Sequence, residues 1–330
     1  MGRRIRIIPA AGVLIVVLTA VCGFYTYYNS VNIGNDVVTV IIEPGDSFSS
    51  VADKLFAEGV VTSRRMLTLV ARLMGIDKKL TPGRYDFTGR NSCRSVLDRL
   101  RRGDVLRIRV TIQEGAPLWK VASILNDRLD LDSAIIANAN HDTTFLTTLG
   151  LPCLEGYLYP ETYLFPWGVS EQEVLRELVK QYHIVTDTVW PDSIMENLTR
   201  SEIIILASII EAETRLADER EVVASVYINR LRRNMKLDAD PTVIYGLGGL
   251  DRPLNRRDIK IDTPYNTYQR KGLPPTPINS PGLAAIRAAL HPAETDYLYF
   301  VADENGGHHF SRTNAEHNRA KQRIKNTSRP

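Results

Sequence analysis

The N-terminus carries the feature that most constrains how this chain can fold. Arg3, Arg4 and Arg6 precede an uncharged stretch that runs from about residue 7 to residue 28. A helix of about 20 apolar residues spans the roughly 30 Å of hydrocarbon in a bilayer, and the tyrosines at the far end of the stretch are typical of an aromatic belt. We therefore expect a transmembrane helix over residues 7–28.

The flanking charges predict how this helix would be oriented. Arginines stay on the cytoplasmic side of a membrane, so residues 1–6 are expected to form a cytoplasmic tail and the rest to be extracytoplasmic or periplasmic. The alternative is a cleaved signal peptide, whose apolar core is about 7–15 residues long and ends at a small-residue site. The longer core here, which leads into tyrosines, favours a single-pass protein of the cell (inner) membrane.

A strand–turn–helix pattern occurs twice in the next part of the chain. In the first copy an apolar strand precedes Gly45 and a helix whose apolar residues recur at i, i+3, i+4 and i+7 from Phe48, with Ser47 as its N-cap. The second copy repeats this pattern around Gly115 and from Leu118. Two copies are too few for a solenoid, so we expect small modules that either act as spacers or bind an extended polymer.

These patterns divide the chain into successive parts. A polar linker over residues 29–37 precedes a first module over residues 38–106. The second strand–turn–helix module, with its connecting helices, occupies residues 107–153. The remaining residues, 154–330, are expected to form a mainly helical domain that ends in a β-hairpin and a basic helix.

Composition excludes several classes of function. The net charge of +3 is too balanced to favour a nucleic-acid partner, and three cysteines cannot build a disulfide scaffold. Cys93 and Cys153 are the only pair outside the N-terminal apolar stretch, and the sequence leaves open whether they bond. The histidines are scattered, and His308 and His309 alternate across a predicted strand, so we expect no metal and no cofactor.

The buried helix expected over residues 202–214 contains the most informative acidic residue. Residues 203–210 are apolar almost all round, and Glu211 follows in helical phase with Ile204 and Ala207. Desolvation on such a face raises the pKa of a carboxyl, as a general acid working near neutral pH requires. The alternatives are that Glu211 begins the exposed end of the helix or pairs with Arg215. Glu213 lies about 200° further round the helix and is expected to face elsewhere.

Two irregular segments flank this helix in the sequence. Residues 155–167 include five aromatic residues and two prolines. Such aromatic rings are suited either to packing against sugar faces or to a hydrophobic core. Residues 263–278 form a long loop stiffened by prolines, and loops of this kind are usually functional or disordered. Ser280 is then predicted to cap a helix that has Pro281 at its first position.

Six separated blocks resemble the endolytic murein transglycosylase (MltG, YceG-like) family, and the N-terminal helix and LysM-like modules fit that family as well. The blocks are residues 155–158, 207–214, 226–231, 240–246, 265–275 and 291–302. The resemblance implies an α+β fold and a membrane-anchored lyase that cleaves the MurNAc–GlcNAc β-1,4 bond inside nascent peptidoglycan strands. It also implies 1,6-anhydroMurNAc ends, termination of strand elongation, and peptidoglycan synthases as partners.

The same resemblance implies roles for individual residues. Glu211 is assigned as the catalytic acid/base, and one carboxyl suffices because the C6 hydroxyl of the substrate attacks C1 intramolecularly. Tyr265, Asn266 and Tyr268 are candidates for binding the glycan, as are Asp240 and Tyr157. Two other functions stay open: a muramidase that hydrolyses the bond with a second carboxylate, such as Asp238 or Asp240, and a non-catalytic scaffold that binds the cell wall.

Overall fold

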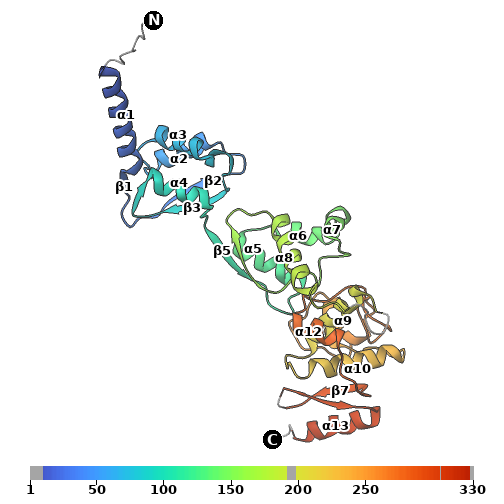
Figure 1. Ribbon diagram of the computed structural model, residues 1–330. Helices are drawn as coiled ribbons and strands as arrows, with labels where there is room; N and C mark the ends of the chain where they lie inside the picture. The colour runs from blue at the N-terminus through green and yellow to red at the C-terminus, as the bar shows by residue number, and fades with distance from the viewer. Residues whose placement is uncertain (1–9, 192–197, 305, 328–330) are drawn as a thin grey trace. The chain divides into compact units, whose positions relative to one another are not determined.

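The computed structural model describes residues 10–191, 198–304 and 306–327 of the chain. It is a mixed α+β protein with many helices and four two-stranded sheets in its described part, as the sequence predicts (Figure 1). The chain divides into two compact units, residues 1–108 with 164–169, and residues 109–163 with 170–330. The expected second module, residues 107–153, thus belongs almost entirely to the second unit.

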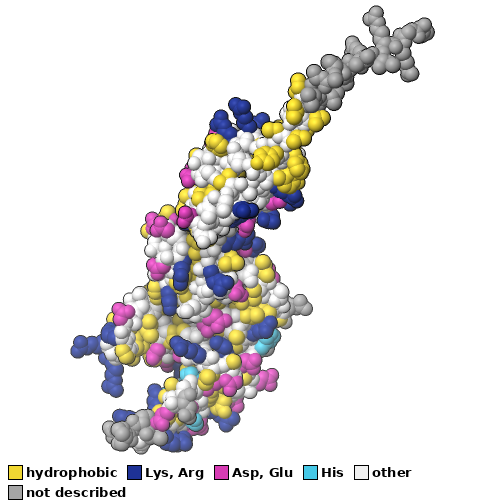
Figure 2. Space-filling model, turned by 90° about the vertical axis from the view of Figure 1, so that its left-hand side faces the viewer, with side chains coloured by type: hydrophobic (Ala, Val, Ile, Leu, Met, Phe, Trp, Pro, Cys, Tyr) yellow, Lys and Arg dark blue, Asp and Glu magenta, His cyan; other side chains and the backbone are white. Residues whose placement is uncertain are grey.

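The first unit begins with helix α1 (Ala10–Tyr28). The expected cytoplasmic tail and residues 7–9 of the expected span lie outside the described residues. The described helix rises about 28 Å, slightly less than the roughly 30 Å of a hydrocarbon core. In the part of the chain that the structure describes, no helix combines the length and apolarity needed to cross a membrane. Several apolar side chains of α1 are exposed, and Figure 2 shows them in yellow beside the grey N-terminal residues.

Two small antiparallel sheets and three further helices complete the first unit. Strand β2 pairs with β3 in the register Val38↔Phe87 to Ile42↔Gly83, and α2 and α3 lie between them in the sequence. Ser47 accepts a hydrogen bond from the Ser50 amide and so caps α2, as predicted. The elements are β1 (Ser30–Asn32), β2 (Val38–Ile42), α2 (Phe48–Ala57), α3 (Arg64–Met74), η1 (Ile76–Lys78), β3 (Gly83–Phe87), β4 (Arg90–Ser92) and α4 (Cys93–Arg102).

The apolar positions predicted for the first module form the core of this unit. Val51 and Leu55 on α2 pack in the same cluster as Leu67 on α3, Tyr85 on β3 and Leu97 on α4, and all five are fully buried. The strand–helix–helix–strand order therefore encloses a small hydrophobic core of its own.

The second unit is larger and mainly helical. Strand β5 pairs with β6, and the boundary between the units falls within both strands. The elements are β5 (Arg107–Thr111), α5 (Leu118–Leu129), α6 (Ser133–Ala139), α7 (Thr143–Leu149), β6 (Thr162–Pro166), α8 (Glu171–Thr186), α9 (Arg200–Glu213), α10 (Arg220–Arg232), α11 (Asp240–Gly246), η3 (Asp258–Lys260), α12 (Leu283–Leu290), β7 (Tyr299–Ala302), β8 (His308–Ser311) and α13 (Asn314–Thr327).

The C-terminal hairpin is confirmed. Strands β7 and β8 pair antiparallel in the register Tyr299↔Ser311 to Ala302↔His308, and Asn305 in the expected turn lies outside the described residues. His308 is largely buried whereas His309 is exposed, which matches their expected alternation.

The predicted start of α12 is wrong. The helix begins at Leu283, with Gly282 at the N-cap position and no side-chain cap. Ser280 does not cap it because its backbone forms an antiparallel bridge with Ala116, in which the Ser280 amide donates to the Ala116 carbonyl at 3.0 Å. Cys93 and Cys153 are both buried free thiols.

Candidate functional site

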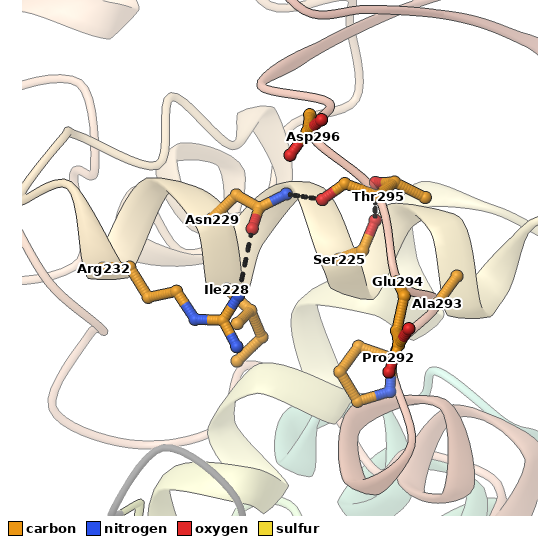
Figure 3. A pocket seen from close by; sticks show the side chains of 9 residues that line it. All are labelled: Ser225, Ile228, Asn229, Arg232, Pro292, Ala293, Glu294, Thr295 and Asp296. Carbon is orange, nitrogen blue, oxygen red and sulfur yellow. Dashed lines mark hydrogen bonds between the residues drawn. The ribbon is translucent and has the colours of Figure 1, made fainter.

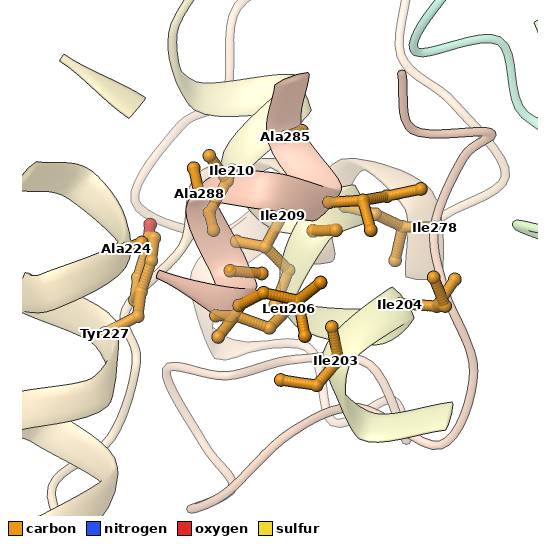
Figure 4. Packing of buried hydrophobic residues seen from close by; sticks show 14 of the residues in the cluster. Ile203, Ile204, Leu206, Ile209, Ile210, Ala224, Tyr227, Ile278, Ala285 and Ala288 are labelled. Atoms are coloured by element: carbon orange, nitrogen blue, oxygen red, sulfur yellow. The ribbon is translucent and has the colours of Figure 1, made fainter. Parts of the chain in front are cut away.

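Helix α9 forms the centre of the second unit because its sequence is apolar on every side. Thr199 and Glu202 form a capping box at its N-terminus. All residues from Ile203 to Ile210 are buried, and they pack against α10 and α12 (Figure 4). Since every face is interior, the acidic residues at the end of the helix enter two different polar environments.

Glu211 lies in a closed polar cluster. The Gly282 amide donates to its Oε2 at 3.0 Å, and the Arg220 guanidinium lies 3.5 Å from its Oε1. Only 7% of the Glu211 side chain is exposed. Burial raises the pKa of this carboxyl, and Glu114 raises it further, while the Gly282 amide and Arg220 oppose the rise. The expected rise in the pKa of Glu211 through burial is therefore confirmed, and its ion-pair partner is Arg220 rather than Arg215, which was the alternative.

Glu213 faces a pocket instead. Together with residues that include Tyr227, Arg230, Asp240 and Tyr268 it lines a cavity of about 460 Å³, of which Glu211 is not a lining residue. The two glutamates lie about 200° apart around the helix axis, so the expectation that they face different surroundings is confirmed. Sequence analysis assigned the catalytic role to Glu211; of the two glutamates, Glu213 lines this cavity.

Burial favours the protonated form of Glu213, although its hydrogen bond from Tyr227 opposes this. Tyr227 donates to Glu213 Oε1 at 2.6 Å, and Tyr268 donates to Asp240 Oδ1 at 2.6 Å. Burial raises the pKa of Glu213 from 4.5 to about 7, against the hydrogen bond from Tyr227 and with a further rise from Asp240. The carboxyl therefore holds its proton near neutral pH, as general acid catalysis requires.

Arg230 forms a rigid part of the pocket wall. Its Nε donates to the Leu298 carbonyl at 2.6 Å, and its Nη1 donates to Asp238 Oδ2 at 2.9 Å. The guanidinium also lies over the ring of Tyr299, 5.0 Å from its centroid. The charge of Arg230 lowers the pKa of Glu213, but the effect of burial is larger.

The other predicted glycan contacts divide into two groups. Asp240 and Tyr268 line the pocket of Glu213. Asn266 is fully buried, and its side-chain amide donates to the carbonyls of Ile259 and Ile261. Tyr157 is buried, and its hydroxyl donates to the Ser201 hydroxyl. Tyr265 is partly buried, and its hydroxyl lies 2.9 Å from that of Thr276. These three side chains hold the protein's own structure and do not line the pocket.

A third carboxyl with a raised pKa is structural. Glu155 is 2% exposed, and its oxygens accept from the Leu118 amide at 3.1 Å and from the Tyr245 hydroxyl at 2.9 Å. Burial raises its pKa to about 7. Glu155 holds the N-terminus of α5 and is not a lining residue of the pocket of Glu213.

A second hollow lies on the far side of α10. It has a volume of about 400 Å³ and is lined by nine residues, among them Ser225, Asn229 and Thr295 (Figure 3). Asn229 donates to the Thr295 carbonyl at 2.7 Å, and the Ser225 and Thr295 hydroxyls are 2.7 Å apart. These hydrogen bonds of Ser225, Asn229 and Thr295 hold the segment before β7 onto α10.

Sequence reasoning did not predict that Glu213, Tyr227, Arg230 and His308 line one pocket. Helical phase could not select Glu213 because a helix that is apolar all round gives no preferred buried face. Asp238 and Asp240 line the same pocket, but they follow the end of α9 only after the whole of α10, so no local pattern connects them to Glu213. In the described ranges no three His, Cys, Asp or Glu side chains gather in a way that could hold a metal ion.

Comparisons with known proteins agree on one protein family. A family model described as the YceG-like family matches residues 40–323. A protein of Bacillus subtilis named endolytic murein transglycosylase is 30% identical over 305 residues, which are 87% of this chain and 84% of that protein. A protein of the same name from Streptococcus pneumoniae is 28% identical over 84% of this chain, which spans 56% of that protein.

A solved structure agrees with the sequence relatives. The crystal structure of a yceG-like protein from Listeria monocytogenes matches with a TM-score of 0.58 and 29% identity. The match covers 86% of this chain and 98% of that one. With the family model matching most of its length, this chain belongs to the YceG-like family.

Proposed function

We propose that this protein is a peptidoglycan lytic transglycosylase, a lyase that cleaves glycan strands internally. The observation that carries the proposal is a single carboxyl, Glu213, kept neutral near pH 7 in a pocket that also holds Asp240 and Tyr268. The relatives named endolytic murein transglycosylase support this reaction class. The bond proposed to break is the MurNAc–GlcNAc β-1,4 linkage, which leaves a 1,6-anhydroMurNAc end.

Glu213 supplies the proton for the first step of this reaction. Its carboxyl protonates the glycosidic oxygen as the bond to C1 breaks, so the leaving sugar departs as a neutral alcohol. The C6 hydroxyl of the same MurNAc then attacks C1, and this intramolecular attack has a high effective molarity. No water enters the product, so a second carboxylate that activates water is not needed.

Glu211, the residue assigned from the sequence, has a different proposed role. Its two oxygens are engaged by the Gly282 amide and by Arg220, so it anchors the loop that ends at α12 to the helix that carries Glu213. Burial nevertheless raises the pKa of this carboxyl, although the Gly282 amide and Arg220 oppose the rise. The variants compared at the end of the Discussion separate the two assignments.

Product analysis tests the reaction class. Uncrosslinked glycan strands are digested with the full chain, and the fragments are analysed by mass spectrometry. Anhydro products are expected, whereas products heavier by one water would indicate a muramidase in which Asp240 or Asp238 activates water. Retention of the strands without cleavage would instead favour a wall-binding scaffold.

We also propose that the chain is anchored in the cell (inner) membrane by its N-terminal segment, with the catalytic unit on the outer side. The basis is the uncharged stretch over residues 7–28 and the arginines before it. Membrane fractionation with protease accessibility tests this proposal, and a shortened soluble product would contradict it.

The first unit is proposed to be a LysM-like module that binds glycan strands. Its strand–helix–helix–strand order around one small core supports a compact binding module. Peptidoglycan synthases are proposed partners, since termination of nascent strands requires cleavage beside the site of synthesis. Crosslinking in growing cells tests the partnership, and recovery of no synthase would contradict it.

A further inference from the structure

Helix α3 carries an apolar stripe that the hydrophobic core of the first unit does not use. Met66, Leu69 and Leu73 are spaced at i, i+3 and i+7 and therefore lie along one face of the helix. Leu67 and Ala71, on another face, are fully buried in the core. In contrast, Leu69 and Leu73 are 55% and 78% exposed. A row of exposed apolar side chains marks a candidate contact surface.

The stripe begins where α1 joins the first unit. Helices α1 and α3 lie side by side (Figure 1), and a Cβ built at Gly23 would lie 3.4 Å from Met66 Cε. Residues 17–22 of α1 are exposed, whereas Gly23 and Tyr27 are partly buried and Tyr27 packs against the core. The part of α1 before Gly23 therefore projects from the unit, and the stripe of α3 starts at the point where α1 emerges.

This junction fixes the level of α3 relative to the proposed membrane anchor. In that anchor the projecting part of α1 lies in the bilayer, so Gly23 and the residues after it lie near the lipid headgroups. Phe24, Tyr25 and Tyr28 are exposed there, as in the aromatic belt of a membrane interface. Because Met66 lies beside Gly23, the stripe of α3 starts at the headgroup level as well.

Basic side chains next to the stripe fit an anionic lipid surface. Residues 64–79 contain five basic residues and one acidic residue. Arg64, Arg65 and Arg72 line a hollow of about 340 Å³, which a leucine of the stripe also lines. Arg64 pairs with Asp53 at 2.7 Å, whereas Arg65 and Arg72 form no ion pair within the described part of the chain. A helix face that combines exposed apolar and basic side chains is typical of helices that lie in a membrane interface.

We propose that this face of α3 is a membrane-binding surface. Leu69 and Leu73 contact the lipid, and the hollow beside them binds the phosphate of an anionic phospholipid through Arg65 and Arg72. The proposal rests on the membrane anchor proposed above and is independent of which glutamate is the acid. One helix alone would leave the first unit free to tilt about α1, whereas this second contact holds the unit against the membrane surface in one orientation.

Site-specific fluorescence of the full chain, reconstituted into vesicles, tests this contact. A bimane label is attached to the double variant Cys22→Ser, Leu73→Cys, in which the two remaining native cysteines are buried. The vesicles contain phosphatidylcholine and about one third phosphatidylglycerol, an anionic lipid. Lipids with a nitroxide near the headgroup should quench about half of the fluorescence or more, because an interfacial apolar face lies about 5–10 Å deep in the lipid.

The role of the arginines is tested with the same label. Quenching should be weaker in vesicles of phosphatidylcholine alone, and Arg65→Gln with Arg72→Gln should lower the quenching in the phosphatidylglycerol vesicles to that level. Equal quenching in both kinds of vesicle would contradict phosphate binding by this face.

Ile41→Cys, also combined with Cys22→Ser, is the matched control. Val40 and Ile42 are buried in the same core as α3, so Ile41, which is 37% exposed, lies on the opposite face of the β2–β3 sheet. A label at this position should stay unquenched by the nitroxide lipids. The wild-type chain labelled at Cys22, an exposed cysteine of α1, tests the anchor itself.

The outcomes separate this inference from the anchor. Quenching at Cys22 without quenching at Leu73→Cys would overturn the inference and leave the anchor intact, whereas a lack of quenching at both positions would contradict the anchor as well. Protection of the Leu73→Cys label from both nitroxide lipids and aqueous iodide would show that a second copy of the chain covers the stripe, which would also overturn the inference.

Discussion

The raised pKa of Glu213 has a measurable consequence for stability, which Glu213→Gln should reveal. The carboxyl titrates at about 7 in the folded protein and ordinarily at 4.5. Below pH 4.5 it is protonated in both the folded and unfolded states. Between pH 4.5 and about 7 only the unfolded state releases the proton, so the free energy of unfolding decreases as pH rises through this range. Above pH 7 the loss is complete.

The size of the effect follows from the pKa difference. One pH unit corresponds to about 1.4 kcal/mol, so the displacement from 4.5 to about 7 corresponds to about 3 kcal/mol. Glutamine does not titrate, so the stability of Glu213→Gln minus that of the wild type should increase by about 3 kcal/mol between pH 4 and pH 9. Urea unfolding at both pH values, with ¹³C NMR titration of the carboxyl, measures this difference. A difference that stays constant with pH would refute the reasoning.

Two further pairs of substitutions test the packing around the site. Glu211→Ala leaves Arg220 without its carboxylate and should lower the free energy of unfolding by about 3 kcal/mol. Glu211→Gln retains an acceptor for the Gly282 amide, so its free energy of unfolding should decrease less. Equal urea midpoints for both variants and the wild type would contradict the anchoring role. Gly156→Ala should cost at least about 2 kcal/mol, because φ is 87° and a Cβ would overlap Pro277. Gly248→Ala is the control, because φ is 79° there too but the space around Gly248 is open. It should lower the free energy of unfolding by only about 1 kcal/mol. If thermal unfolding shows the same loss of stability for both variants, contact with Pro277 is unimportant.

Local patterns predicted most elements of this fold. The buried helix expected over residues 202–214 is observed as Arg200–Glu213, and the C-terminal hairpin forms as expected. The start of α12 could not be predicted in this way, because Ser280 bonds with Ala116, far away in the sequence. Capping preferences describe local hydrogen bonds, and a long-range bridge overrides them.

The site was less predictable than the fold. The sequence singled out this helix end because acidic residues directly follow a wholly apolar run. The sequence analysis selected Glu211, whereas the surroundings of Glu211 and Glu213 depend on the segments that pack against opposite faces of α9. Gly282 and Arg220 bind Glu211 on one face, and Glu213 lines the pocket on the other face. The role of Asn266 was equally hard to predict: its side-chain amide donates to the Ile261 carbonyl within its own loop, and it does not line the pocket.

The most direct test of the account compares Glu213→Gln and Glu211→Gln in the same assay. Both full chains, with the wild type, are incubated with uncrosslinked glycan strands, and anhydro ends are counted by mass spectrometry while circular dichroism monitors folding. We predict that folded Glu213→Gln releases no anhydro ends above background and that Glu211→Gln, where folded, retains cleavage. Normal cleavage by Glu213→Gln, with loss of cleavage in a folded Glu211→Gln protein, would contradict the account and restore Glu211 as the acid.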